Sequence, residues 1–172
     1  MYLISYGTRP ELIKLFPLIN KFKENNIDHK TIFTGQHQDL IKEFENLTHR
    51  PDFVLEKTMK HKQSINSLIY KIINESQKII NSYDCKVIIQ GDAASSFAVA
   101  LSAFNEGKEI IHVEAGLRTH NLRSPFPEEG FRKMISHISN IHFCPTKNSV
   151  ENLKNEGITE NVHLVGNTIV DS

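Results

Sequence analysis

The chain has 172 residues, a length that suits one domain with a substantial hydrophobic core. Lys and Arg together number 20, as do Asp and Glu, so the charge balance offers neither a basic surface for nucleic acid nor an acidic tail. No signal peptide precedes the first apolar segment, and the longest apolar runs are four or five residues, against roughly 20 for a membrane-spanning helix. We therefore expect a soluble, cytoplasmic protein that binds neither nucleic acid nor a membrane.

The two cysteines, Cys85 and Cys144, lie far apart in the sequence, and each stands beside an apolar run. Free cysteine is among the most buried residue types, so this placement favours two buried thiols over a disulfide. Free thiols agree with a reducing compartment.

Segments with strand-like and helix-like patterns alternate along the first half of the chain. Glycine ends each of the first two strand-like runs, and apolar residues at helical spacing follow. The expected elements are strands at 1–6, 29–34 and 53–55, the last being the weakest, and helices beginning at Pro10, over 40–47 and over 64–83.

The second half continues the same alternation. Its first strand, with the sequence KVIIQ, is apolar in the middle without alternating, as is typical of a strand covered on both faces. The expected elements are strands at 86–90, 110–113, 141–144 and 162–165, and helices over 93–105, 128–139 and 146–156. Six or seven strands alternating with helices predict an α/β fold with a doubly wound, mostly parallel, Rossmann-like sheet.

Ligands of open parallel sheets bind outside the carboxyl ends of the strands, so the residues that follow each strand are the informative ones. These segments are Gly7–Glu11, Gly35–His37, Gly91–Asp92, His112 with Glu114–Thr119, and Gly166–Thr168. Carboxylates stand out there, because Asp92 and Glu114 each follow a buried strand and Glu128 opens the next helix. Three carboxylates at one sheet edge favour a site for acid/base chemistry.

Each carboxylate also has a structural interpretation. Asp92 stands between a strand and a helix, where Asp is a common N-cap. Glu114 could pair with Arg118, and Glu128 or Glu129 could serve only to offset the helix dipole in the first turn. A partly desolvated Glu114 would instead have a raised pKa that suits catalysis.

Arginines gather in the same loops. Four of the five, namely Arg9, Arg118, Arg123 and Arg132, lie there or in the helix after Pro127. The planar guanidinium suits phosphate or carboxylate recognition, and the turn before Pro10 adds backbone N–H groups that can face an anion. The alternative is that these arginines only pair with neighbouring carboxylates. Taken together, the loops predict a site for a phosphorylated small molecule.

The sequence lacks the motifs of several common kinds of site. The nine histidines include no HExxH pattern, and His112 with Glu114 lacks a third metal ligand. The chain contains no GxxxxGK[ST] P-loop, no GxGxxG dinucleotide fingerprint and no GxSxG nucleophile elbow. We therefore expect neither a metal site nor a bound dinucleotide cofactor.

Six blocks of sequence, in order along the chain, carry a resemblance to a known family. They are Gly7-Thr8-Arg9-Pro10-Glu11 with Lys14, Thr34-Gly35-Gln36-His37, Gln90-Gly91-Asp92, His112-Val113-Glu114-Ala115-Gly116-Leu117-Arg118-Thr119, Ser124-Pro125 with Pro127-Glu128-Glu129 and Arg132, and Gly166-Asn167-Thr168. With these blocks the chain resembles the non-hydrolysing UDP-N-acetylglucosamine (UDP-GlcNAc) 2-epimerases of bacteria and archaea.

The resemblance implies interconversion of UDP-GlcNAc and UDP-N-acetylmannosamine without NAD or metal. The reaction runs by elimination of UDP to a 2-acetamidoglucal and re-addition of UDP. Asp92, Glu114 and Glu128 match the acid/base carboxylates of the family. The substrate-binding residues implied by the resemblance are Arg9, Lys14, His112, Arg118 and Arg132.

Two further expectations follow from the resemblance. Gln36, His37 and Gln63 match a region where some members bind an activating second UDP-GlcNAc, although Asp39 replaces a Gln found in some of them. Ala93 stands where the family usually has Thr, which removes a hydroxyl beside Asp92 and could indicate a related sugar.

Family members have two α/β domains in the GT-B arrangement, with the active site between them, and are expected to be homodimers. The resemblance assigns residues 1–166 to the Rossmann-like N-terminal domain and 167–172 to the start of the crossover to a second domain absent from this chain. The 172 residues alone should then be inactive. The alternative function is a non-catalytic sugar-nucleotide-binding or assembly module derived from the family.

Overall fold

The computed structural model describes residues 1–35, 50–55 and 63–167. Their strands are β1 (Tyr2–Tyr6), β2 (His29–Phe33), β3 (Phe53–Val54), β4 (Lys86–Gln90), β5 (Ile110–Val113), β6 (Ile141–Cys144) and β7 (Val162–Leu164). Their helices are α1 (Arg9–Glu24), α3 (Ile65–Asn81), α4 (Ala94–Asn105), α5 (Glu128–Ile138) and α6 (Lys147–Asn155). The alternation predicted for these segments is confirmed, and the helix expected over 40–47 lies outside the described residues.

The seven strands form one sheet in the order β3-β2-β1-β4-β5-β6-β7, and every neighbouring pair is parallel. From β1 the chain builds outward through β2 and β3, then returns to the other side of β1 and continues through β4 to β7. The expected α/β, doubly wound, Rossmann-like sheet is confirmed. Its strand order reverses between β1 and β4, which is where open α/β sheets form their ligand crevice.

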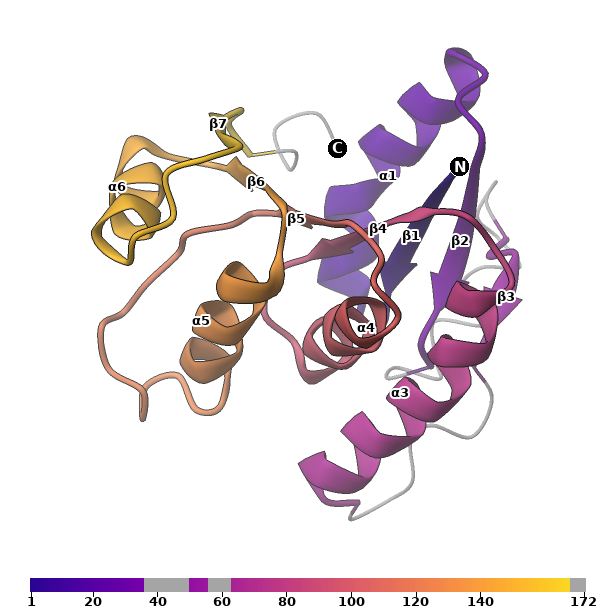
Figure 1. Cartoon of the computed structure of the whole chain (residues 1–172), viewed down its shortest axis with the longest axis horizontal. Helices are drawn as coiled ribbons and strands as arrows, with labels where there is room; N and C mark the ends of the chain where they lie inside the picture. The colour runs from indigo at the N-terminus through magenta and orange to yellow at the C-terminus, as the bar shows by residue number, and fades with distance from the viewer. Residues whose placement is uncertain (36–49, 56–62, 168–172) are drawn as a thin grey trace.

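Helices cover both faces of the sheet (Figure 1), with α3, α4 and α5 on one face and α1 on the other. Adjacent residues of a strand serve opposite faces, as the pleat requires. In β4, Val87 and Ile89 pack in the core under α3, α4 and α5, whereas Ile88 packs in the core under α1. The apolar middle of β4 is therefore explained by burial on both faces. A smaller cluster joins α6 to the sheet through Cys144 and Leu153.

The turn from β1 into α1 is unusually well specified by the sequence. Thr8 is the N-cap of α1, and its hydroxyl accepts a hydrogen bond from the Glu11 backbone N–H at 3.4 Å, while the Glu11 carboxylate accepts one from the Thr8 N–H at 3.2 Å. This reciprocal capping box fixes the first turn of the helix. Pro10 lies in that turn, where its missing N–H does no harm.

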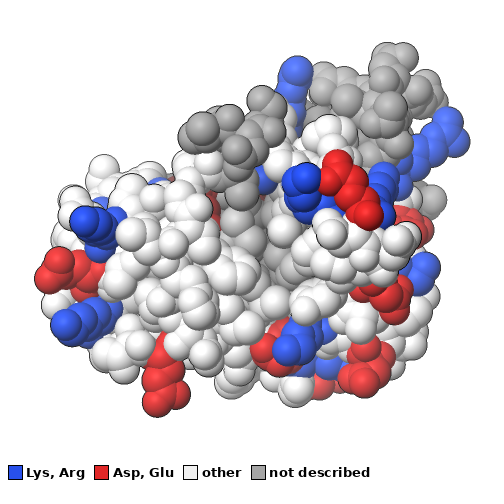
Figure 2. All heavy atoms as spheres, turned by 90° about the horizontal axis from the view of Figure 1, so that it is seen from above, with Lys and Arg blue, Asp and Glu red and all other residues white. Residues whose placement is uncertain are grey.

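The surface carries charges of both signs, as the balanced composition predicts. Lys and Arg side chains are interspersed with Asp and Glu on the face shown in Figure 2, without an extended area of one sign.

Cys85 and Cys144 are buried free thiols, as predicted, and burial raises the pKa of Cys144 to about 11. Within the described part of the chain, no helix is both long and apolar enough to cross a bilayer.

Candidate active site at the carboxyl ends of β1, β4 and β5

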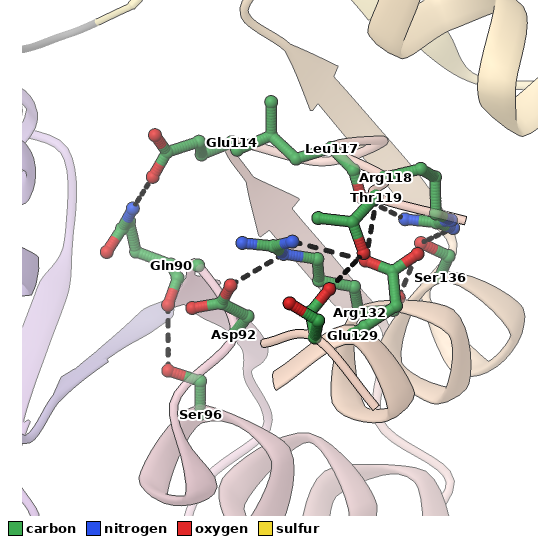
Figure 3. A network of polar contacts seen from close by, with 12 residues as sticks. Gln90, Asp92, Ser96, Glu114, Leu117, Arg118, Thr119, Glu129, Arg132 and Ser136 are labelled. Carbon is green, nitrogen blue, oxygen red and sulfur yellow. Dashed lines mark hydrogen bonds and ion pairs between the residues drawn. The ribbon is translucent and has the colours of Figure 1, made fainter. Parts of the chain in front are cut away.

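The parallel arrangement of the strands brings Asp92 and Glu114 to one edge of the sheet. Because β1, β4 and β5 are parallel neighbours, the segments that follow them lie side by side, and these segments hold Gly7, Asp92 and Glu114. Figure 3 shows Asp92 and Glu114 at the ends of adjacent strands, with Arg132 reaching toward them from α5. The expected convergence at the switch point is therefore present in the geometry.

Glu114 is held by donors from two different elements. The Lys14 ammonium group, on α1, donates to both carboxylate oxygens at 2.8 and 2.6 Å, and the side-chain amide of Gln90 donates to the Oε2 atom. The Glu114 backbone has φ +65°, a left-handed conformation that costs about 1–3 kcal/mol in a non-glycine residue. The pairing of Glu114 with Arg118 that the sequence left open is wrong, since Lys14 takes that place.

Asp92 is held by an arginine and does not cap a helix. Its Oδ2 atom accepts a hydrogen bond from the Arg132 Nε atom at 2.6 Å. Ala93 occupies the N-cap position of α4, and no side chain caps that helix end. The N-cap interpretation of Asp92 is therefore wrong, because the helix begins one residue too late for it. The carboxylate therefore lies at the carboxyl ends of the strands, and Arg132 fixes its orientation.

Glu128 and Glu129 have different environments, although both lie in the first turn of α5. Glu129 is fully buried and accepts hydrogen bonds from the backbone N–H groups of Thr119 and His120, each at 3.0 Å, and from Arg132 at 3.1 Å. Burial opposes its ionisation, but these hydrogen bonds outweigh burial and lower the pKa of Glu129. Glu128 is only half-buried. Glu129 is therefore the structural member of the pair, and Glu128 is the one available to a ligand.

Arg118 is buried and paired within the fold. Its side chain is 0% exposed and donates to both carboxylate oxygens of Glu156, at 3.0 and 2.7 Å, and to the Ser136 hydroxyl at 3.0 Å. The hydrogen bond from Arg118 lowers the pKa of Glu156 to about 2. In this structure Arg118 ties the turn after β5 to α5 and to the residue that follows α6, and its expected contact with a substrate stays a prediction.

His112 is also buried within the fold. Its Nε2 atom lies 2.9 Å from the Gly91 carbonyl oxygen, and only 1% of the residue is exposed. Burial lowers the pKa of His112 to about 3, so the ring is neutral and can donate to Gly91. The expected contact of His112 with a substrate stays a prediction. In this structure the ring braces the turn that carries Asp92.

Glu11 is a buried carboxylate to which the sequence assigned no role. It accepts hydrogen bonds from the Gly7 N–H at 2.5 Å and from the Thr8 N–H, and its Oε1 atom lies 3.2 Å from the Ser96 hydroxyl. Burial raises its pKa to about 7, although these hydrogen bonds act in the opposite direction. The Thr-x-x-Glu spacing is the signal that could have identified it. Glu11 shapes the turn between β1 and α1 from beneath.

The remaining predicted residues are spread around this edge. Arg9 is the first residue of α1 and is exposed, and Arg123 is exposed in the segment before α5. Gln63 accepts a hydrogen bond from Lys71 at 3.1 Å just before α3. Gln36 and His37 lie outside the described residues, so the expected activator region is not brought together here.

A parallel Rossmann-like sheet with carboxylates paired to cations at its switch point defines the class of α/β proteins that bind ligands at this edge of the sheet. The family model described as UDP-N-acetylglucosamine 2-epimerase matches residues 20–172. The chain belongs to the UDP-N-acetylglucosamine 2-epimerase family, as the sequence blocks indicated.

Individual relatives agree with this membership. The UDP-N-acetylglucosamine 2-epimerase of Salmonella borreze is 38% identical over 174 residues, which cover 99% of this chain and 46% of the relative. The protein of the same name from Campylobacter jejuni is 37% identical, with coverage of 99% and 45%. A crystal structure of UDP-GlcNAc 2-epimerase from Neisseria meningitidis bound to UDP-GlcNAc matches with a TM-score of 0.91 at 37% identity and covers 99% and 47%.

The chain spans about half the length of the curated relatives and solved structures that it matches. This share is consistent with one half of a two-domain GT-B architecture, and the matching half is the N-terminal one. A structure from Methanocaldococcus jannaschii, solved in complex with UDP-GlcNAc and UDP, matches to the same extent, with a TM-score of 0.89 and 48% coverage of that chain.

Proposed function

We propose that these residues form the N-terminal half of an enzyme that interconverts UDP-GlcNAc and UDP-N-acetylmannosamine. The observation that carries the proposal is the pair of held carboxylates, Asp92 and Glu114, at the switch point of a chain that belongs to the epimerase family. The relative from Neisseria meningitidis was solved with UDP-GlcNAc bound, which supports the same substrate here. In this proposal residues 1–166 are the domain proper and 167–172 begin the crossover to a second one.

The proposed reaction needs a base, an acid and cations, but neither NAD nor a metal. One carboxylate removes the proton from C2 of the sugar, the C2–H electron pair becomes the C1–C2 double bond, and the C1–O bond breaks so that its pair leaves with UDP. Re-addition of UDP at C1, with a proton delivered to the opposite face of C2, gives the epimer. Carboxylates on two sides of the sugar suit this order of steps, because one removes a proton from one face of C2 and another delivers a proton to the opposite face.

We assign the acid/base roles to Asp92, Glu114 and Glu128. The Lys14 ammonium group and the Arg132 guanidinium orient the carboxylates of Glu114 and Asp92 respectively, which supports the assignment of proton transfer to these two residues. We assign binding of the departing diphosphate to Arg9, at the N-terminus of α1. The ammonium group of Lys14 and the guanidinium of Arg132 assist it.

The decisive experiment is an isotope assay on a polypeptide in which residues 1–172 are followed by a second half like that of the relatives. In deuterated water, we expect interconversion of the two UDP-sugars with deuterium incorporated at C2. Asp92→Asn, Glu114→Gln and Glu128→Gln should each lower kcat by about 10²-fold or more without loss of the circular dichroism of the fold. The exposed changes Asp84→Asn and Glu160→Gln are the matched controls.

The contrasting candidate is a sugar-nucleotide-binding or assembly module without catalysis. It would bind UDP-GlcNAc in a calorimeter but give no deuterium at C2, and the three carboxylate variants would bind as the parent does. If that pattern were found, the acid/base roles would be withdrawn. We further infer a cytoplasmic location and a homodimeric assembly for the longer polypeptide.

A further inference from the structure

Gln90 is a buried polar side chain at the site, to which neither the sequence blocks nor the proposed chemistry gives a role. It is the last residue of β4 and is 2% exposed. Its side-chain amide points to Glu114 across the strand ends, as Figure 3 shows, and donates a hydrogen bond to the Oε2 atom. A buried amide that ends on a proposed catalytic carboxylate needs a functional explanation.

The backbone of Gln90 is itself fixed. The Ser96 hydroxyl, in the first turn of α4, donates to the Gln90 carbonyl oxygen at 2.7 Å, and the same hydroxyl lies 3.2 Å from the buried carboxylate of Glu11. Gln90 therefore sits at the end of a buried chain of polar contacts that runs from the β1–α1 turn to the site. Few of its rotamers are open, so the direction of its N–H is set before any ligand arrives.

Among the residues that the structure describes, the other side chain that donates to the Glu114 carboxylate is Lys14, a donor of a different kind. The Lys14 side chain is 22% exposed at the end of a flexible stem, and its ammonium group can turn to a bound anion. Glu114 also lacks support from regular structure, because its backbone leaves β5 in a left-handed conformation. The buried amide of Gln90 is thus the donor that sets the orientation of the Glu114 carboxylate.

We propose that Gln90 is a positioning residue that holds the Glu114 carboxylate in its reactive orientation and remains in place when Lys14 shifts toward the substrate. This inference rests on the proposed epimerase function. It predicts that loss of the Gln90 amide affects the chemical step more than binding, because a misdirected base loses the alignment on which proton transfer depends.

The test is Gln90→Met, which keeps the length and volume of the side chain but removes the donor. In the longer polypeptide we expect kcat to fall by about 10- to 100-fold with KM little changed. Gln77→Met, at an exposed glutamine on α3, is the matched control and should leave both properties unchanged.

A double-mutant cycle separates positioning from a general structural effect. In the Glu114→Gln background, Gln90→Met should cost little further activity, since the group that it positions is already gone. Equal losses in both backgrounds would overturn the inference. An active parent whose Gln90→Met variant keeps its kcat overturns the inference alone, whereas an inactive parent overturns the proposed function as well. If Gln90→Met fails to fold, Gln90→Glu, which sets a carboxylate against Glu114, replaces it with the same expectation.

Discussion

Gly7 illustrates how one residue sets the geometry of the site. A Cβ atom at this position would lie 2.1 Å from the Thr34 Oγ1 atom and 2.8 Å from the Ser95 side chain. No side chain fits there unless both neighbours move. The absence of a side chain lets the ends of β1 and β2 approach the start of α4, and the Gly7 N–H then reaches Glu11.

We therefore expect Gly7→Ala to destabilise the protein by roughly 1–3 kcal/mol through overpacking. Gly130→Ala is the matched control, because nothing lies within 4 Å of a Cβ atom there and the residue is inside α5. That change should stabilise the fold by up to about 1 kcal/mol through helix propensity. Urea unfolding of both variants measures the difference, and equal midpoints would contradict this account of Gly7.

At this scale the sequence indicated which residues matter but not which ones touch. Strand ends and residue types identified Asp92 and Glu114. Their partners could not be predicted, since Arg132 lies 40 residues beyond Asp92 and Lys14 lies 100 residues before Glu114. Local rules favoured a nearby cap or arginine instead. Only the packing of helices on the sheet decides such pairs.

At the scale of elements, the alternation was predictable because burial on two faces leaves long apolar runs in the strands. The first residue of each helix was less predictable. Ser64 and Thr146, which the pattern included in helices, are N-caps in the structure, and each accepts a hydrogen bond from a backbone N–H in the first turn. Side chains that cap a helix resemble its first residues in sequence, so boundaries shift by one position.

Strands β5 and β6 place two buried histidines opposite each other, which makes the sheet sensitive to acid. His112 pairs in register with His142, and burial lowers the pKa values to about 3 and about 4 respectively, with Arg118 adding to both effects. An unfolded histidine has a pKa of about 6.5. As the pH falls below that value, the unfolded chain takes up protons that the folded chain refuses, so the free energy of unfolding falls.

We expect His112→Gln to reduce this loss, because the amide can still donate to the Gly91 carbonyl and does not titrate. Between about pH 6 and pH 4.5 the slope of unfolding free energy against pH should be smaller by about 1.4 kcal/mol per pH unit. Glu11 has a raised pKa, so its protonation increases the free energy of unfolding as the pH falls. Because Glu11 is present in both proteins, this contribution cancels from the difference between their slopes. Urea unfolding at several pH values measures the slopes, with the exposed His163→Gln as control.

At the scale of the whole molecule, the fold class followed from the pattern, whereas the strand order did not. Periodicity identifies strands but does not say which strands are neighbours, so the central place of β1 is known only from the structure. Relatives are about twice as long as this chain, so no pattern within 172 residues could describe the remaining half of their length.

We expect residues 1–172 alone to show no measurable interconversion and only weak affinity for UDP-GlcNAc, because one wall of a cleft supplies only part of the contacts. The longer polypeptide should be active and should bind in calorimetry. Size-exclusion chromatography with light scattering on the same samples tests the proposed dimer. Robust activity of the 172 residues by themselves would show that this edge is a complete site.

The central position of β1 also bears on how the chain is made. Strand β1 leaves the ribosome before β2 and β4, yet it hydrogen-bonds to β2 on one side and to β4 on the other. Its β4 side cannot be closed until Lys86–Gln90 has been synthesised. During that interval the nascent chain carries an open, apolar strand edge, the kind of edge that chaperones shield and that aggregation exploits. The strand that anchors the finished sheet is therefore the one that waits longest for its second neighbour.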